Sequence, residues 1–207
     1  MPTAKTEKRN QPASPEEHQV RSWVQEAKAG NRRAFEHLAN HYYGEIFRMI
    51  YYRIQSRVDA EDITQEIFLK AYKGLGRLTD NNRFKGWLYR IAINRVKDFH
   101  RRKKFRKLFK PLSHDIVNTQ IDIQESPEPD PFEALTRKRF RQESEKFMAR
   151  LSKTEKHVFT LRFFDQLTTN EMATALRKSE STIKTHLYRA LAKFKHDSTF
   201  RSFLKGE

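Results

Sequence analysis

The chain has 207 residues, enough for one large domain or two small ones, and we expect two. Its 42 Lys and Arg outnumber its 26 Asp and Glu, which gives a formal net charge of +16. This excess indicates a polyanionic partner, with nucleic acid first and an anionic membrane surface second. Because cysteine is absent, disulfides, thiolate metal sites and thiol redox switches within the chain are excluded.

The distribution of apolar residues argues against a membrane or secreted protein and against sheets. Residues 1–15 lack the apolar core of a signal peptide, and no apolar run approaches the roughly 20 residues of a membrane-spanning helix. We therefore expect a soluble cytoplasmic protein without membrane insertion. With 6 Gly, 7 Pro and no sustained period-2 alternation, the sequence predicts an all-α fold.

Residues 1–13 predict a disordered extension, followed by a domain over 14–108. Ser14 and Pro15 predict the start of a first helix, which should stop near Gly30. Asn31 is then placed to cap a longer helix whose apolar residues from Phe35 to Ile54 keep helical spacing. A third helix is expected to start at residues 59–62 and run to about residue 75, before a polar break at 79–82.

The fourth predicted helix begins near Arg83 and separates apolar from basic residues. Trp87 falls on the apolar face and is expected in the core rather than as a stacking platform, whereas Tyr89 is expected to be more exposed. Another face carries a basic stripe with one amide, at Arg90, Asn94, Lys97 and Arg101. A block of Lys and Arg over 101–107 continues this charge and favours phosphate.

A reversal of charge marks the boundary between two domains. Residues 111–133 contain no Lys or Arg but six acidic residues, together with prolines at 127, 129 and 131. This composition predicts a flexible acidic linker over 109–130 and a second small helical domain over 131–207.

Capping patterns predict the helices of the second domain. Asp130 should cap the first, and Ser152 to Glu155 and Thr168 to Glu171 each form a capping-box pattern ahead of a short apolar helix. A last helix is expected from about Glu180 to His196.

Residues 168–195 follow the order of a helix-turn-helix: a short helix, a turn at 177–179 without the frequent glycine, and a longer basic helix. Ile183 should anchor the second helix in the core. Donor and aromatic groups project from its other side and suit base edges and phosphates in a major groove: Ser181, Lys184, Thr185, Tyr188 and Arg189. The competing interpretation is an ordinary helical hairpin with a solvated face.

Four acidic residues lie close together in the sequence, at Asp59, Glu61, Asp62 and Glu66, and could be interpreted as a metal site. Consecutive helical positions scatter these carboxylates, so neither a metal nor another cofactor is expected, and the patch is better suited to a protein partner. No catalytic motif is present in the sequence, so we do not expect an enzyme.

Two groups of motifs resemble bacterial sigma factors. Residues 59–68 with 84–94 resemble their first conserved domain, and residues 161–164 with 181–190 resemble their last. With two domains only, the chain is similar to the extracytoplasmic-function (ECF) group of the sigma-70 family. The resemblance implies binding to core RNA polymerase, promoter-specific initiation and control by a separate anti-sigma protein.

The resemblance also implies roles for particular residues. Asp62, Gln65 and Glu66 would bind core polymerase. The minus-10 element would be met by the loop of Asn81, Asn82 and Arg83 and by the helix carrying Tyr89, Arg90, Asn94, Lys97 and Arg101. The minus-35 element would be met by Ser181, Thr182, Lys184, Thr185, Tyr188 and Arg189. Lys184 takes the place of an arginine frequent in the family and lacks its bidentate fork.

Two other functions remain as alternatives. The first is a stand-alone helix-turn-helix regulator that does not bind polymerase. The second is a basic membrane-surface or RNA-binding protein, whose affinity would be strongly salt-dependent and indifferent to promoter sequence.

Overall fold

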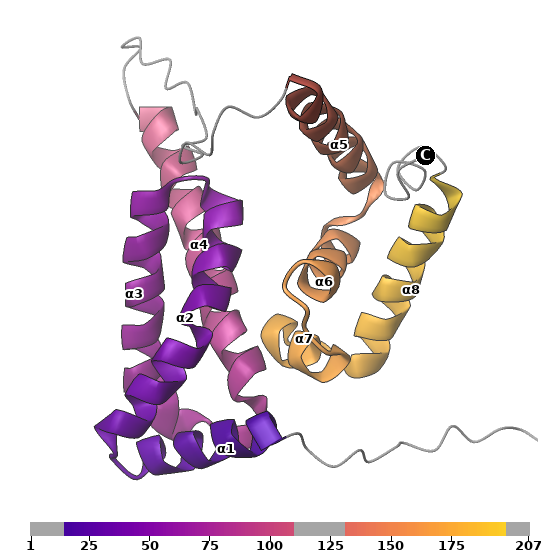
Figure 1. The fold of residues 1–207 in the computed structure, drawn as a ribbon. Coiled ribbons are helices and arrows are strands. Elements are labelled where there is room, and N and C mark those ends of the chain that lie inside the picture. The colour runs from indigo at the N-terminus through magenta and orange to yellow at the C-terminus, as the bar shows by residue number, and fades with distance from the viewer. Residues whose placement is uncertain (1–14, 110–130, 198–207) are drawn as a thin grey trace, which may run out of the picture.

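The computed structural model describes residues 15–109 and 131–197, and all regular elements in these ranges are helical (Figure 1). The all-α prediction is therefore confirmed. None of the described helices is long and apolar enough to cross a membrane. The predicted N-terminal extension, the Ser14 cap, the segment 110–130 and the Asp130 cap lie outside the described residues.

Four helices and two short 3-10 turns form the first half of the fold. The helices are α1 (Pro15–Lys28), α2 (Arg32–Ile54), α3 (Arg57–Gly74) and α4 (Phe84–Phe109), with η1 (Leu75–Arg77) and η2 (Asn81–Arg83) between the last two. α1 runs across one end of α2, α3 and α4 (Figure 1). The apolar stripes of α2, α3 and α4 meet in a core in which Leu38, Ile46, Ile67 and Leu88 are fully buried.

Local signals explain where these helices begin and end. Gly30 ends the first with a φ of +98°, a conformation that favours glycine, and the Asn31 side chain accepts from the Ala34 amide as expected. The third helix starts earlier than predicted. Ser56 is its cap and accepts from the backbone N–H of Asp59, so Asp59 lies in the first turn and is not the start.

The second half comprises α5 (Pro131–Arg150), α6 (Lys153–Phe163), α7 (Thr169–Leu176) and α8 (Glu180–His196). Both predicted capping boxes, Ser152 with Glu155 and Thr168 with Glu171, are confirmed. α7 and α8 form the predicted helix-turn-helix. Arg177 adopts the left-handed conformation, with a φ of 53°, at the turn position where glycine is frequent.

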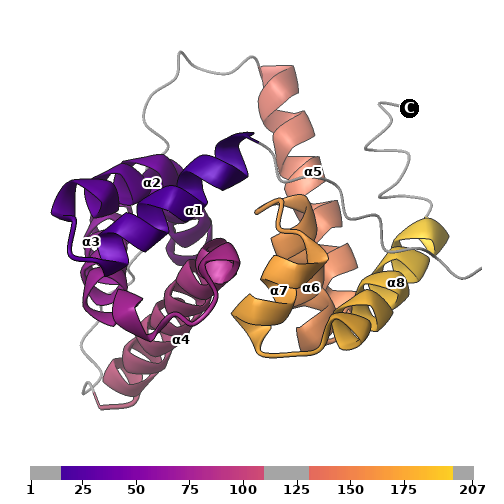
Figure 2. The same cartoon turned by 90° about the horizontal axis from the view of Figure 1, so that it is seen from below.

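The two domains pack against each other through α4 and α7, as Figures 1 and 2 show from two directions. The largest cluster of buried apolar residues runs continuously from the first domain into Leu161, Leu167 and Met172 of the second. A smaller cluster around Phe147 and Phe159 holds α5, α6 and α8 together. Buried apolar residues of α4, α6 and α7 thus form one continuous layer between the two domains.

Candidate nucleic-acid interface

The outer face of α8 is open to solvent. Ile183 and Ala190 are fully buried and fix the helix against the domain, which confirms Ile183 as an anchor. On the opposite side Ser181, Lys184, Thr185, Tyr188 and Arg189 are exposed, and Tyr188 keeps 76% of its surface accessible. Thr182 differs, since it is half-buried and its hydroxyl lies 2.8 Å from the capping Ser179 hydroxyl. α8 thus presents a polar, basic surface at helical spacing.

The exposed side of α4 carries a second basic surface. Asn94, Lys97 and Arg101 are exposed, and Arg101 forms an ion pair of 3.1 Å with Asp98. Trp87 is buried in the core, as predicted.

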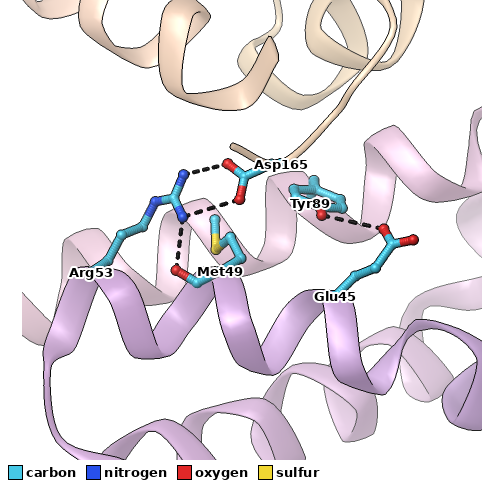
Figure 3. A network of polar contacts seen from close by, with 5 residues as sticks. All are labelled: Glu45, Met49, Arg53, Tyr89 and Asp165. Carbon is cyan, nitrogen blue, oxygen red and sulfur yellow. Dashed lines mark hydrogen bonds and ion pairs between the residues drawn. The ribbon is translucent and has the colours of Figure 1, made fainter. Parts of the chain in front are cut away.

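Tyr89 does not lie where the sequence placed it. Its ring is 1% exposed and its hydroxyl donates to Glu45 Oε2 at 3.4 Å, so the expected exposure is wrong (Figure 3). The second domain supplies the reason, because the segment from Phe163 to Gln166 borders the same cavity as Tyr89. Burial, with Glu45 and Asp165 nearby, raises the pKa of Tyr89 above its ordinary value.

Arg90 is half-buried at the same junction between the domains. Burial and the guanidinium of Arg177, in the turn of the helix-turn-helix, lower the pKa of Arg90 from its ordinary value. The positive charge of Arg177 in the second domain thus acts on Arg90 of the first.

The loop ahead of α4 is held by its own polar groups. The Asp80 carboxylate accepts a hydrogen bond from the backbone N–H of Asn82 at 3.0 Å and forms an ion pair with Arg83 at 3.2 Å. Asn82 and Arg83 are exposed, and Asn81 is half-buried. Together with α7, this loop encloses a cavity of about 380 Å³, which is also lined by the carboxylates of Glu16, Glu17, Glu45 and Glu171. Arg21 and Lys85 line the same cavity, and Lys85 pairs with Glu45 at 3.0 Å, so the carboxylates exceed the lysine and arginine side chains by four to two. This net negative charge does not favour a DNA phosphate in this arrangement.

A partly buried ion pair joins the two domains. Arg53 of α2 donates to both carboxylate oxygens of Asp165, at 3.3 and 2.5 Å, and to the Met49 carbonyl at 2.8 Å (Figure 3). The side chain of Asp165 is 6% exposed and that of Arg53 is 23% exposed. This geometry is bidentate and charge-assisted, the stronger form of such a contact.

Gly86 permits the close approach of α4 to α7. A Cβ at this position would lie 2.7 Å from the Glu171 carbonyl oxygen and 2.8 Å from the Thr174 Cβ, so any other residue requires the helices to shift. The signal for this contact in the sequence is an isolated glycine within a helical pattern, which often marks a close approach of two backbones.

The outer face of α3 carries the residues expected to bind polymerase. Asp62, Gln65 and Glu66 are exposed, and Glu66 pairs with Arg95 of α4. Sequence reasoning missed an apolar groove of about 510 Å³ beside Gln65, in which Tyr43, Leu69 and Tyr72 are exposed. Exposed apolar residues gathered beside polar ones are typical of a protein-binding surface. In the described ranges no three possible ligand side chains come together to hold a metal ion.

Comparison with known families finds a match in each half of the chain. The family described as Sigma-70 region 2 matches residues 38–106, which cover most of α2 to α4. The family described as Sigma-70, region 4 matches residues 141–194, which include the helix-turn-helix. The chain belongs to the sigma-70 family. It is an ECF-type sigma factor, a protein of promoter-specific transcription initiation by RNA polymerase and not an enzyme.

Individual relatives place the chain in the same group. It is 33% identical to the ECF RNA polymerase sigma factor BldN of Streptomyces coelicolor, over 81% of this chain but only 61% of that protein's length. It is 27% identical to the RNA polymerase sigma-H factor of Pseudomonas aeruginosa, over 84% of this chain and 91% of that one.

The fold is also similar to that of a solved structure. CnrH, in complex with the cytosolic domain of CnrY, aligns with a TM-score of 0.58 and 22% identity, over 87% of this chain and 99% of that one. At this identity the likeness supports the fold alone.

Proposed function

We propose that the protein divides initiation among three surfaces. The exposed face of α8 reads the minus-35 element as duplex DNA. The exposed face of α4 and the loop 79–83 read the minus-10 element and stabilise the opened strand. The α3 face with Gln65 and the neighbouring apolar groove bind core RNA polymerase. In this proposal residues 14–108 form the polymerase and minus-10 domain, 109–130 the linker, and 131–207 the minus-35 domain.

The observation that carries the proposal is the presence of two basic, solvent-exposed helix faces on separate domains. Lys184 and Arg189 stand on one face, and Asn94 and Lys97 stand on the other. A single operator site needs one such face, whereas two promoter elements need both. The exposed groove on α3 adds a protein surface that a stand-alone regulator does not require.

The two domains must separate before both faces can engage one promoter. Elements about 25 base pairs apart lie about 85 Å apart along B-DNA at 3.4 Å per base pair. Packed helices lie only about 8–10 Å apart, so α8, which packs on α7, lies roughly 20 Å from α4 here. We therefore propose that the compact arrangement is a resting state and that binding to polymerase opens it.

Regulation and location belong to the same proposal. We propose a cytoplasmic protein controlled by a separate anti-sigma partner. The support for a partner is indirect: the similar chain CnrH was solved in complex with the cytosolic domain of CnrY.

Reconstitution with core RNA polymerase tests the division of labour. Arg189→Ala should weaken binding to minus-35 duplex and leave core affinity unchanged, and Asn94→Ala should impair strand opening while also leaving core affinity intact. Gln65→Ala should do the reverse, with lower core affinity and unchanged duplex binding. If the purified chain does not bind core and yields no promoter-specific transcript, the stand-alone regulator is the better account.

A further inference from the structure

The loop of Asn81, Asn82 and Arg83 has a contact with α1 that its proposed role does not explain. Lys28, the last residue of α1, extends its ammonium group to the loop and donates to the Leu78 carbonyl oxygen at 2.8 Å and to Asn81 Oδ1 at 3.1 Å. These residues are 50 and 53 positions away in the sequence. The contact therefore joins two elements that only the tertiary fold brings together.

The first of these bonds positions the backbone of the loop. The Leu78 side chain is buried, and its backbone N–H donates to the Leu75 carbonyl at 3.0 Å. The Lys28 bond satisfies the carbonyl of the same residue. Both polar groups of the Leu78 backbone are thus paired immediately before the loop begins, which limits how the loop can move.

The second bond fixes the direction of the Asn81 amide. An ammonium group can only donate hydrogen bonds, so the side chain must turn its oxygen toward Lys28 and its NH₂ group away from it. Without a charged neighbour, an amide can present either its oxygen or its nitrogen to a ligand. Asn81 also lines the cavity of about 380 Å³ that Asn82 and Phe84 border.

We propose that Lys28 is a positioning residue for base selection, which rests on the proposed role of the loop at the minus-10 element. By holding Asn81 Oδ1, Lys28 makes Asn81 a hydrogen-bond donor, so the loop prefers an unstacked base that offers an acceptor atom. Lys28 itself does not touch DNA in this proposal. The contact between Lys28 and Asn81 thus leaves only the NH₂ donor of Asn81 available to the base.

A promoter library randomised across the minus-10 element tests the proposal with the full chain and core polymerase. Lys28→Met should lower base discrimination at one position about fivefold, the effect of one hydrogen bond of ordinary net strength, which is worth about 1 kcal/mol. Lys28→Arg keeps a donor-only cation and should restore discrimination. Lys73→Met removes a charge from the exposed surface of α3 and is the matched control, for which we expect no change.

Asn81→Asp provides a second, independent variant. Its carboxylate keeps the contact to Lys28 but replaces the NH₂ donor with an acceptor, so the preference should shift toward a base that offers a donor at the same position. This variant tests the donor role of Asn81 even if Lys28→Met lowers the melting temperature, and Lys28→Arg then tests the role of the cation. The role of Lys28 is overturned if base preferences are unchanged in both Lys28→Met and Asn81→Asp while Asn81→Ala alters one position. The proposed function of the loop would still stand in that case. If Asn81→Ala also changes nothing, the proposed function of the loop is lost with it.

Discussion

Replacement of Arg53 by methionine removes the charge that joins the two domains while keeping most of the apolar bulk of the side chain. The guanidinium makes two bonds to Asp165, whose side chain is only 6% exposed. Breaking a fully buried pair costs about 3–5 kcal/mol because one charge is left uncompensated. Arg53 retains 23% exposure, so we expect a smaller value of about 2 kcal/mol, near that of a charge-assisted hydrogen bond.

A loss of about 2 kcal/mol corresponds to a roughly 30-fold rise in the ratio of open to compact molecules. Energy transfer between two dyes measures this ratio, and because the natural chain has no cysteine, Gln25→Cys in α1 and Ala149→Cys in α5 label the two domains selectively. The low-transfer fraction should increase in Arg53→Met.

Arg33→Met is the matched control, since Arg33 is exposed on the same helix and away from the second domain's cavity. Its transfer distribution should equal that of the unaltered chain. Adding Asp165→Asn to Arg53→Met should recover part of the loss, because the carboxylate left behind is neutralised. An unchanged distribution in Arg53→Met, or an equal shift in Arg33→Met, would show that the Arg53–Asp165 pair does not hold the domains together.

Three further predictions concern the same surfaces. Gly86→Ala should open the compact arrangement, because the new Cβ would clash with Glu171 and Thr174. Helix content measured by circular dichroism should not fall, because alanine favours the helix more than glycine does. An unchanged transfer distribution would contradict this prediction. Burial and the neighbouring cations Lys97, Lys153, Arg53 and Lys156 lower the pKa of His157, so the compact arrangement takes up fewer protons than the open one. The fraction of compact molecules should therefore be highest above about pH 6.5 and should decrease as the pH is lowered further. His157→Gln should remove this pH dependence. Leu69→Asp should weaken binding to core polymerase about tenfold, as measured by a fluorescence anisotropy titration. Leu69 is 61% exposed in the free chain, and burial of a leucine in an interface contributes about 1.5–3 kcal/mol. An unchanged affinity would show that the groove is not part of the interface.

Local features of the fold were predictable from the sequence. Gly30, Asn31 and the two capping boxes placed helix ends correctly, because a cap is a bond between residues only a few positions apart. The start of α3 was missed because Ser56 precedes the acidic residues that we read as the cap. The five residues predicted to project from α8 are all exposed. Thr182, which the resemblance alone assigned to the minus-35 element, contacts the capping Ser179 instead.

Long-range contacts were not predictable in the same way. The burial of Tyr89 depends on a second domain more than 70 positions away, and helical periodicity carries no information about that contact. The Arg53–Asp165 pair and the bond from Lys28 to Asn81 also depend on tertiary placement. The α3 groove was not predicted because it forms only where α2 packs on α3. That packing brings Tyr43 of α2 beside Leu69 and Tyr72 of α3.

The separation of the two domains on polymerase is the measurement that tests the account most directly. The doubly labelled chain, compact and high-transfer in the free state, should change to low transfer when it binds core RNA polymerase and a promoter carrying both elements. A complex that transcribes from that promoter while its transfer efficiency stays at the value of the free chain would contradict the proposed opening of the two domains.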